Sequence, residues 1–288
     1  NESLRKNITE AISFLKKTKI TVKAKAKKLN QAPWFLLIGA KNSGKSTLLH
    51  TSDLKFNLEP KSFHQHKHPH WWVNANAVYV DLPGAYTDPD NKDKAKLALK
   101  LIKKNAPQKT IQAVILVVSI KDMLRMKEEE QAAYLDDITS QLQQFKPKQP
   151  VFVVFNKLDL LSGFNAFFDD FSLDERQQPW GFNLSNTSGV KLLDKITTEF
   201  DRLVQRLNQQ LIWRLHHEPS LQKRTLIKDF PAQFAGIKVS LLRFFTELLS
   251  RSKNNAYLGI YFTAARIGQP NAGNITSDKA LAVIGQQA

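Results

Sequence analysis

A glycine-rich run that ends in lysine and serine is the first feature of this sequence with the residue types for chemistry. It reads Gly39-Ala40-Lys41-Asn42-Ser43-Gly44-Lys45-Ser46 and matches the P-loop (Walker A) pattern. Glycines let the backbone curl until several N–H groups face one phosphate, and the start of a following helix adds a favourable dipole. Lys45 would then reach the β- and γ-phosphates, and the Ser46 hydroxyl would bind Mg²⁺. The residues expected to contact the nucleotide here are Gly39, Asn42, Ser43, Gly44, Lys45, Ser46 and Thr47.

A second run, Asp81-Leu82-Pro83-Gly84, closes an apolar segment further along the chain. A carboxylate at the end of a strand is placed to hold Mg²⁺, often through water, and the Gly84 N–H would sense the γ-phosphate. Alone, the pattern is common and fits an ordinary turn after a strand. Its position after a P-loop favours Asp81 as a metal ligand and Gly84 as a nucleotide contact.

A third run, Asn156-Lys157-Leu158-Asp159, follows another apolar segment. Asp159 would accept hydrogen bonds from the ring N–H and the 2-amino group of guanine, and adenine offers no donors at those positions. Asn156 would brace the loop, and the stem of Lys157 would cover the base. A plain polar turn is the alternative. Together, the three runs predict GTP or GDP with Mg²⁺ as the cofactors and make ATP the weaker candidate.

The residues that would carry out hydrolysis are harder to find. In Ras-like enzymes a glutamine directly after the D-x-x-G run orients the attacking water, and Ala85 occupies that position here. Thr51, Ser52 and Ser62 all remain candidates for the hydroxyl that completes the Mg²⁺ shell. We therefore assign no catalytic residue and expect slow or absent hydrolysis.

A histidine-rich run precedes the tryptophan pair Trp71-Trp72. If it formed a strand, its alternating histidines would share one face and could bind a metal. We prefer to interpret it as a flexible, partly charged switch loop. The histidines are His64, His66, His68 and His70.

The elements that must position these runs follow from hydrophobic patterning. Short apolar segments at 35–38, 77–80, 113–119 and 151–155 have the character of buried parallel strands. Because polar, helix-compatible stretches separate the later ones, the pattern predicts an α/β fold. We expect a P-loop GTPase-like parallel sheet with helices on both faces.

The last third of the chain has a different character. Residues 191–217 and 221–250 carry apolar side chains at helical spacing and are separated by Pro219. These stretches predict a mainly helical subdomain. Pro231 should break or kink the second stretch. A possible strand at 257–262 and a polar tail end the chain.

Three segments are therefore expected. Residues 1–32 form a basic N-terminal helix, 33–185 the GTPase-like domain, and 186–288 the helical subdomain with its terminal strand and tail. The helix is indicated by apolar residues at steps of three and four, which are Leu4, Ile8, Ile12 and Leu15.

Charge and composition narrow the class of partner. Lys and Arg number 42 against 26 Asp and Glu, so the formal net charge is +16. Such an excess favours an anionic partner, which could be a nucleotide, a nucleic acid or a membrane surface. Basic residues crowd the first thirty positions, where they could rest on anionic lipid or form a solvated helix. No RNA-binding motif is present, so nucleic-acid binding is not expected.

The chain lacks cysteine, which excludes disulfides, and it lacks an apolar stretch long enough to span a bilayer.

The ordered string of motifs resembles the cytoplasmic part of the IcmF/TssM family of bacterial secretion-system proteins. The resemblance extends from about Pro33 to Thr263 and has two departures. Ala85 stands where the family often has Arg, which weakens a catalytic role, and Asn156 stands where many members have Thr, which strengthens the guanine interpretation. The residues that carry the resemblance are 33–39, the P-loop, Trp71-Trp72 before 77–81, Gly84-Ala85-Tyr86-Thr87, 157–164, Trp180-Gly181-Phe182 and 259–263.

The resemblance implies a protein of the bacterial inner membrane, with this segment on the cytoplasmic side and membrane-spanning helices outside it. It also implies a DotU/TssL-like membrane partner and other secretion-complex subunits. The basic, histidine-rich version is closer to IcmF of type IVB systems than to TssM of type VI systems. We therefore expect a membrane-anchored GTP-binding component that stabilises the inner-membrane complex. A structural scaffold with a vestigial nucleotide site is the alternative, and an ATPase motor ranks last.

Overall fold

The computed structural model describes residues 2–17, 19–22, 25–28, 32–52, 54–60, 67–106, 111–145, 149–172, 178–184, 190–252 and 255–264. For residues 19–22, 25–28 and 190 it describes the backbone alone.

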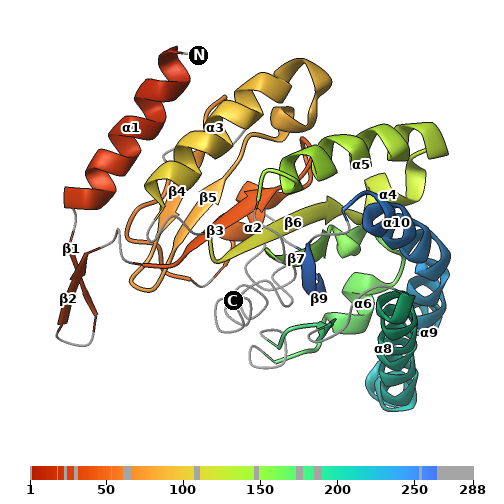
Figure 1. Ribbon diagram of the computed structural model, residues 1–288. Helices are drawn as coiled ribbons and strands as arrows, with labels where there is room; N and C mark the ends of the chain where they lie inside the picture. The colour runs from red at the N-terminus through yellow and green to blue at the C-terminus, as the bar shows by residue number, and fades with distance from the viewer. Residues whose placement is uncertain are drawn as a thin grey trace.

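A seven-stranded sheet forms the centre of the molecule, with the strand order β4-β5-β3-β6-β7-β9-β8 (Figure 1). The five inner strands run parallel, whereas β4 and β8 pair antiparallel to β5 and β9 at the two edges. The predicted α/β class is confirmed, but the sheet is mixed at its edges rather than parallel throughout. The strands are β3 (Trp34–Ile38), β4 (His70–Val73), β5 (Val78–Asp81), β6 (Ala113–Ser119), β7 (Pro150–Asn156), β8 (Gly181–Asn183) and β9 (Ala256–Phe262).

The inner strands are apolar along their length because both faces of the sheet are covered. Every residue of β3 and β6 is buried, which accounts for their continuous apolar runs. Alternate residues of each strand belong to two separate cores. Leu36 and Leu116 point into one core, and Phe35 and Ile115 point into the other.

Helices cover the two faces unequally. In the part of the chain that the structure describes, the smaller core receives helical residues only from α2 (Lys45–His50), through Leu48 and Leu49. The larger core is covered by many helices (Figure 1). They include α1 (Glu2–Lys17), α3 (Lys92–Asn105), α4 (Ile120–Arg125), α5 (Glu128–Leu142), α6 (Phe164–Phe168), α8 (Val190–His217), α9 (Leu221–Gly236) and α10 (Lys238–Arg251).

The N-terminal helix is shorter than expected. Helix α1 buries Leu4, Ile8, Ile12 and Leu15, as their spacing predicts, and it lies beside α3 (Figure 1). It ends at Lys17 instead of continuing to residue 32. An antiparallel strand pair follows, β1 (Lys19–Val22) and β2 (Lys25–Lys28). The run Ile20-Thr21-Val22 explains the change, because β-branched side chains disfavour helix and favour strand.

The helical stretches of the last third are confirmed, but Pro231 does not break the second one. Helix α9 runs through Pro231 to Gly236, and α10 begins at Lys238. Proline inside a helix costs about 3 kcal/mol. Here the side chains of Phe230, Pro231 and Phe234 are all buried, so packing offsets that cost. The terminal strand β9 then enters the main sheet between β7 and β8.

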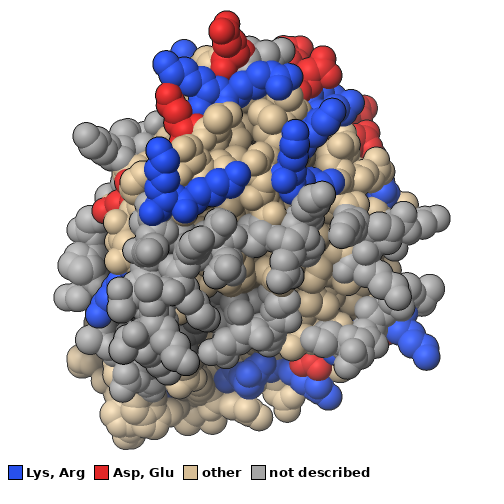
Figure 2. All heavy atoms as spheres, turned by 60° about the vertical axis from the view of Figure 1, so that its left-hand side comes forward, with Lys and Arg blue, Asp and Glu red and all other residues tan. Residues whose placement is uncertain are grey.

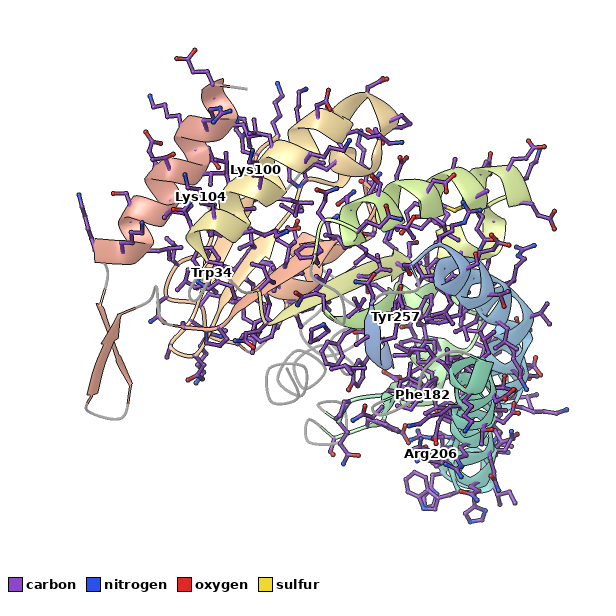
Figure 3. All side chains as sticks on the ribbon, in the orientation of Figure 1. Trp34, Lys100, Lys104, Phe182, Arg206 and Tyr257 are labelled. Atoms are coloured by element: carbon purple, nitrogen blue, oxygen red, sulfur yellow. The ribbon has the colours of Figure 1, made fainter. Side chains whose placement is uncertain are left out.

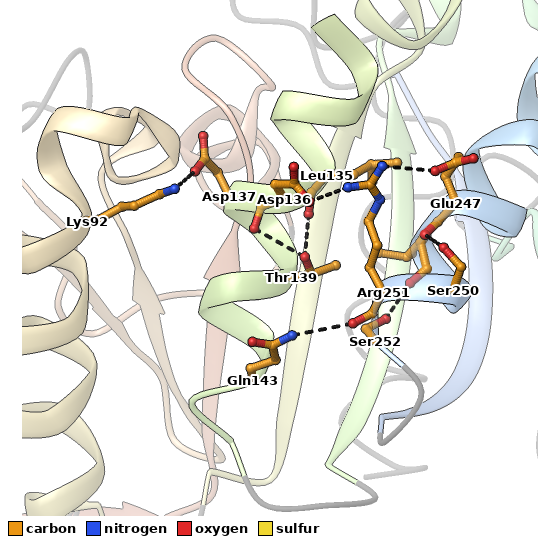
Figure 4. Close-up of polar contacts among 11 residues, drawn as sticks. Lys92, Leu135, Asp136, Asp137, Thr139, Gln143, Glu247, Ser250, Arg251 and Ser252 are labelled. Carbon is orange, nitrogen blue, oxygen red and sulfur yellow. Dashed lines mark hydrogen bonds and ion pairs between the residues drawn. The ribbon is translucent and has the colours of Figure 1, made fainter. Parts of the chain in front are cut away.

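Polar contacts join three of the helices (Figure 4). Lys92 of α3 forms an ion pair with Asp137 of α5 at 2.9 Å, and this hydrogen bond raises the pKa of Lys92. Arg251, at the end of α10, contacts Asp136 of α5 and Glu247 of its own helix. Helix α5 therefore links α10 to α3, the helix that directly follows the D-x-x-G loop.

Candidate nucleotide-binding site

The P-loop connects β3 to α2 and has a curled backbone. Asn42 and Gly44 have φ angles of 61° and 90°, in the left-handed region. A Cβ atom added to Gly44 would lie 2.2 Å from Nδ2 of Asn156, so glycine is needed here both for conformation and for space. Helix α2 starts at once, with the Leu48 N–H donating to the Gly44 carbonyl at 2.8 Å.

The ammonium group of Lys45 lies inside this curl. It donates hydrogen bonds to the carbonyl oxygens of Gly39 at 2.8 Å and Ala40 at 3.1 Å. Burial lowers the pKa of Lys45, and the nearby Asp81 carboxylate partly opposes that shift. Because a phosphate oxygen is a stronger partner for ammonium than a carbonyl, an incoming polyphosphate would compete for this group.

Ser46 and Asp81 meet beneath the loop. The Ser46 hydroxyl donates to Oδ2 of Asp81 at 2.5 Å, and Asp81 is fully buried at the end of β5. A carboxylate and a hydroxyl at one point are the hard oxygen ligands that Mg²⁺ prefers. The two residues predicted to hold the metal therefore lie together, and their donor set fits it.

The D-x-x-G loop packs directly on the P-loop. A Cβ atom added to Gly84 would lie 2.5 Å from the Cα of Lys41, so no larger residue fits without moving one of the loops. Gly84 opens the 3₁₀ turn η2 (Gly84–Thr87), which the Thr87 hydroxyl closes by donating to the Gly84 carbonyl at 2.8 Å. The amide of Gln141 on α5 donates to the Tyr86 carbonyl at 3.0 Å and anchors the turn.

Asn156 joins the third run to the P-loop. Its Nδ2 donates to the Ser43 carbonyl at 3.2 Å, and its Oδ1 accepts from the Lys157 N–H at 2.7 Å. Lys157 has a φ of 67°, which turns the chain into η5 (Leu158–Leu160), where Asp159 lies half-buried. The bracing role predicted for Asn156 matches this geometry, whereas the contacts of Lys157 and Asp159 with a base remain predictions.

A cavity of about 1120 Å³ opens over the P-loop. Its walls include four lysines, namely Lys41 of the P-loop, Lys45 of α2, Lys67 before β4 and Lys94 of α3, and among the described residues that line it there is no carboxylate. Residues 156–159 are not part of this lining, so the cavity covers the P-loop and the D-x-x-G loop but not the third run. Besides Lys41–Thr47 and 83–86, its lining residues are Ser3, Leu4, Lys67, His68, Asn91 and Lys94.

Several of these residues were not predicted from the sequence. Ser3 of α1 hydrogen-bonds His68 at 2.8 Å across one side of the cavity. Outside the lining, burial raises the pKa of Tyr134 on α5, and a hydrogen bond with the backbone of Ala40 in the P-loop partly opposes that rise. Ser3 and Tyr134 belong to no motif, and His68 was considered only as part of the histidine run, so only the folded chain shows that they lie near the P-loop.

The candidate hydroxyls for the Mg²⁺ shell have other partners. Thr51 donates to the Thr47 carbonyl at 2.8 Å and Ser52 to the Leu49 carbonyl at 2.6 Å, both at the end of α2 and outside the cavity lining. Ser62 lies outside the described residues.

The histidine run does not form one strand face in the part that is described. Only His70 belongs to β4, and His64 and His66 lie outside the described residues. Within the described residues, no three His, Cys, Asp or Glu side chains gather closely enough for a metal site. None of the described helices has the length and apolar character needed to cross a bilayer.

Comparisons with known proteins place this chain among bacterial secretion-system proteins. The family described as IcmF-related N-terminal domain matches residues 91–286. Type VI secretion system component TssM1 of Pseudomonas aeruginosa is 31% identical over 287 residues, covering 91% of this chain and 26% of that protein. The chain therefore spans about a quarter of the relative's length.

Two solved structures share weaker similarity. A probable GTP-binding protein engB is 19% identical over 44% of this chain and 71% of its own, with a TM-score of 0.31. An ADP-ribosylation factor-like GTP-binding protein from Encephalitozoon cuniculi, in complex with GDP, is 15% identical over 88% of both chains, with a TM-score of 0.30. The fold assignment rests on the strand order of this chain and not on these two likenesses.

Proposed function

Because the chain belongs to the IcmF-related (IcmF/TssM) family, we propose that it is the guanine-nucleotide-binding segment of a bacterial secretion-system component. In this proposal the segment acts as a switch or a slow GTPase that stabilises a membrane complex. The named relative is a type VI component, and the greater likeness to type IVB proteins stays a prediction.

The observation that carries the proposal is the convergence of three strand ends on one loop. The P-loop contacts the D-x-x-G run through Gly84 and Lys41, and it contacts the third run through Asn156 and Ser43. Ligand sites in open α/β sheets lie at the carboxyl ends of the strands, which is where these runs meet. Three motifs brought together in this way support a nucleotide more strongly than any one of them does.

Each group has a defined part in the proposed complex. Backbone N–H groups of the P-loop and the Lys45 ammonium would hold the phosphates, and Ser46 and Asp81 would hold Mg²⁺. When bound, Mg²⁺ supplies charge neutralisation at the β- and γ-phosphates. Asp159 would select guanine. Ala85 lines the cavity but has no group that could orient a water molecule, so turnover is expected to be slow or absent.

The larger assembly is also part of the proposal. Membrane anchoring would come from segments outside this chain, and the segment would face the cytoplasm at the bacterial inner membrane. A DotU/TssL-like membrane protein and other secretion-complex subunits would be its partners. Nucleic acid is not among the proposed partners.

One observation favours the scaffold alternative. Lys45 donates to two loop carbonyls and Ser46 donates to Asp81, so the polar groups of the phosphate site are already hydrogen-bonded to each other. A vestigial site would keep the same contacts for stability alone. An ATPase motor has no comparable support.

A calorimetric titration with GTP, GDP and ATP in the presence of Mg²⁺ tests the proposal. The wild-type chain should bind GTP more tightly than ATP, and Lys45→Ala should weaken GTP binding by about a hundredfold or more. Lys191→Ala, at an exposed lysine of α8, is the matched control and should bind like the wild type. Absence of any nucleotide binding would support the scaffold instead, and a preference for ATP would contradict the role given to Asp159.

A further inference from the structure

Helices α1 and α3 together form a strongly basic outer surface. Each buries its apolar side against the same core, α1 through residues such as Ile8 and α3 through Leu99 and Ile102. The two helices carry ten Lys and Arg side chains and three Asp and Glu side chains, an excess of seven. They therefore hold nearly half of the chain's net charge of +16 in a small part of its length. Figure 2 shows many Lys and Arg side chains over the upper part of the molecule, where the two helices lie, with fewer Asp and Glu side chains among them.

A lysine stripe runs along the outside of α3. Lys96, Lys100 and Lys104 follow one another at intervals of four residues and are all exposed. Like charges at this spacing repel and destabilise a helix. Within the described part of the chain none of the three forms an ion pair, whereas Lys92 of the same helix pairs with Asp137. An anion that binds along this stripe would therefore reduce the repulsion among the three lysines.

The rest of the molecule distributes its charges differently. On α8, Arg202 pairs with Glu199, and Asp201 pairs with Lys238 of α10. Arg206 on α8 lies at the opposite end of the molecule from Lys100 and Lys104 (Figure 3). Helices α8, α9 and α10 also carry more cations than acids, but several of their cations form ion pairs, whereas the lysine stripe of α3 forms none within the described residues.

Helix α1 also carries an exposed aromatic side chain. Phe14 of α1 is 48% exposed and lies close in sequence to Lys16 and Lys17. A helix that carries both cations and an exposed aromatic ring is typical of contact with the headgroup region of a bilayer.

We propose that the α1–α3 surface binds the anionic face of a lipid bilayer through the phosphate headgroups. Its residues are Arg5, Lys6, Phe14, Lys16, Lys17, Lys96, Lys100 and Lys104. The surface is independent of nucleotide, and the proposal holds whether or not the P-loop binds GTP.

The side-chain types favour lipid over nucleic acid. Nine of the ten cations are Lys and one is Arg. Lysine acts as a compact point charge, which suits attraction to mobile headgroups. Recognition of guanine edges and bidentate contacts with phosphate use the planar fork of Arg, which is nearly missing from these two helices.

Sedimentation with vesicles tests the proposal. The wild-type chain is mixed with vesicles of phosphatidylcholine alone or of phosphatidylcholine and phosphatidylglycerol in equal parts, at about 0.1 M salt. It should sediment only with the anionic vesicles and dissociate as salt is raised. The triple variant Lys96→Glu/Lys100→Glu/Lys104→Glu should lose at least about tenfold in binding. The neutral triple variant with Gln at these positions should fall in between.

A second triple variant separates a local surface from net charge. Lys191→Glu/Arg206→Glu/Lys228→Glu makes the same change in charge on exposed residues of α8 and α9. It should retain binding within about threefold, because these residues lie away from the surface. Thermal unfolding of each variant checks that the fold is intact.

Three outcomes would overturn the proposal. The wild-type chain could remain in the supernatant with anionic vesicles. Both triple variants could lose binding equally, which would make the effect one of net charge. Duplex DNA at equal phosphate concentration could remove the protein from the vesicles. If the α3 triple variant also lost binding to DNA, nucleic acid would be the partner.

A further variant, Phe14→Ser, should weaken vesicle binding and leave any DNA binding unchanged.

Discussion

Lys45 is the residue on which the phosphate site depends. Its ammonium group is buried and held by the Gly39 and Ala40 carbonyls at 2.8 and 3.1 Å. Burial disfavours the charged form, and this is the main cause of its lowered pKa. The group is therefore held in place before any ligand arrives, in an environment where a phosphate would stabilise its charge.

The lowered pKa predicts how stability depends on pH. An unfolded lysine stays protonated up to its ordinary value of 10.5, whereas folded Lys45 releases its proton at lower pH. Between the folded-state and unfolded-state values the unfolded chain binds more protons, so the free energy of unfolding rises with pH across that window. Below the window, Lys45 lowers stability by a constant amount.

A comparison with Lys45→Met isolates this effect. Unfolding temperatures of both proteins are measured without nucleotide from about pH 8 to pH 10. The unfolding temperature of the wild type should rise relative to that of the variant as the pH increases. A difference that stays constant over this range would mean that Lys45 keeps its ordinary pKa in the folded protein.

Asp159 sets the expected base preference. If its carboxylate accepts from the guanine ring N–H and 2-amino group, Asp159→Ala should reduce the ratio of GTP to ATP affinity by about a hundredfold. Competition binding with a fluorescent GTP analogue measures that ratio. Asp229→Ala, at an exposed acid of α9, is the control and should leave the ratio unchanged. Loss of GTP and ATP binding in equal measure would point to a structural role for Asp159.

At the scale of elements, the site is a junction of three loops. The P-loop lies between the other two loops. Gly84 packs against Lys41 of the P-loop, and Asn156 donates a hydrogen bond to the Ser43 carbonyl of the P-loop. The D-x-x-G loop continues through η2 and η3 (Pro89–Asn91) into α3, which the ion pair between Lys92 and Asp137 holds to α5. A change at the γ-phosphate position would therefore be transmitted first to α3.

Gly84→Ala tests this junction. The new Cβ would lie 2.5 Å from the Lys41 Cα, so the loop must move away from the P-loop. Affinity for GTP should fall by about tenfold or more, and affinity for GDP should change little, because the Gly84 N–H is proposed to contact the γ-phosphate. Gly236→Ala is the matched control, since nothing lies within 4 Å of a Cβ at that helical site. It should be neutral or stabilise the protein by about 0.5–1 kcal/mol. Equal losses for GTP and GDP would show that Gly84 shapes the whole loop and does not sense the third phosphate.

At the scale of the whole molecule, the predicted GTPase-like and helical segments share one sheet. Strand β9 lies between β7 and β8, and among the described strands it is the one partner of β8. Phe262 of β9 stacks on Phe155 of β7 and packs against Phe234 of α9. The C-terminal segment thus completes the hydrophobic core on which the site-bearing strands rest.

Truncation tests this dependence. A fragment of residues 1–185 loses β9 and the three long helices, which leaves β7 as an open edge and exposes the side chains packed on them. It should lack a cooperative thermal transition, whereas the full chain should unfold in one step. Circular dichroism across a temperature ramp distinguishes the two results. A fragment with a sharp transition would mean that residues 33–185 form an independent domain.

Particular elements show how far sequence reasoning reached. Strands β3, β5, β6 and β7 were predicted because continuous apolar runs of this kind must be buried on both faces, and three of them end in a motif. Strands β4 and β8 were missed, since they are short edge strands whose partners lie elsewhere in the chain. The prediction of a helix over residues 1–32 was wrong beyond Lys17. The many lysines of this segment drew attention away from the β-branched run Ile20-Thr21-Val22, which favours a strand.

Sequence alone determined the local features on which the proposed nucleotide site rests, namely a loop that could curl around a phosphate, oxygen groups that could bind Mg²⁺ and a carboxylate that could select a base. Those features depend on backbone freedom and side-chain type over a few neighbouring positions. Tertiary structure decided which distant groups share the cavity, that β9 completes the sheet, and that α1 and α3 combine their charges on one surface. Such facts depend on how buried apolar faces pair in space, and no short stretch of sequence specifies that pairing.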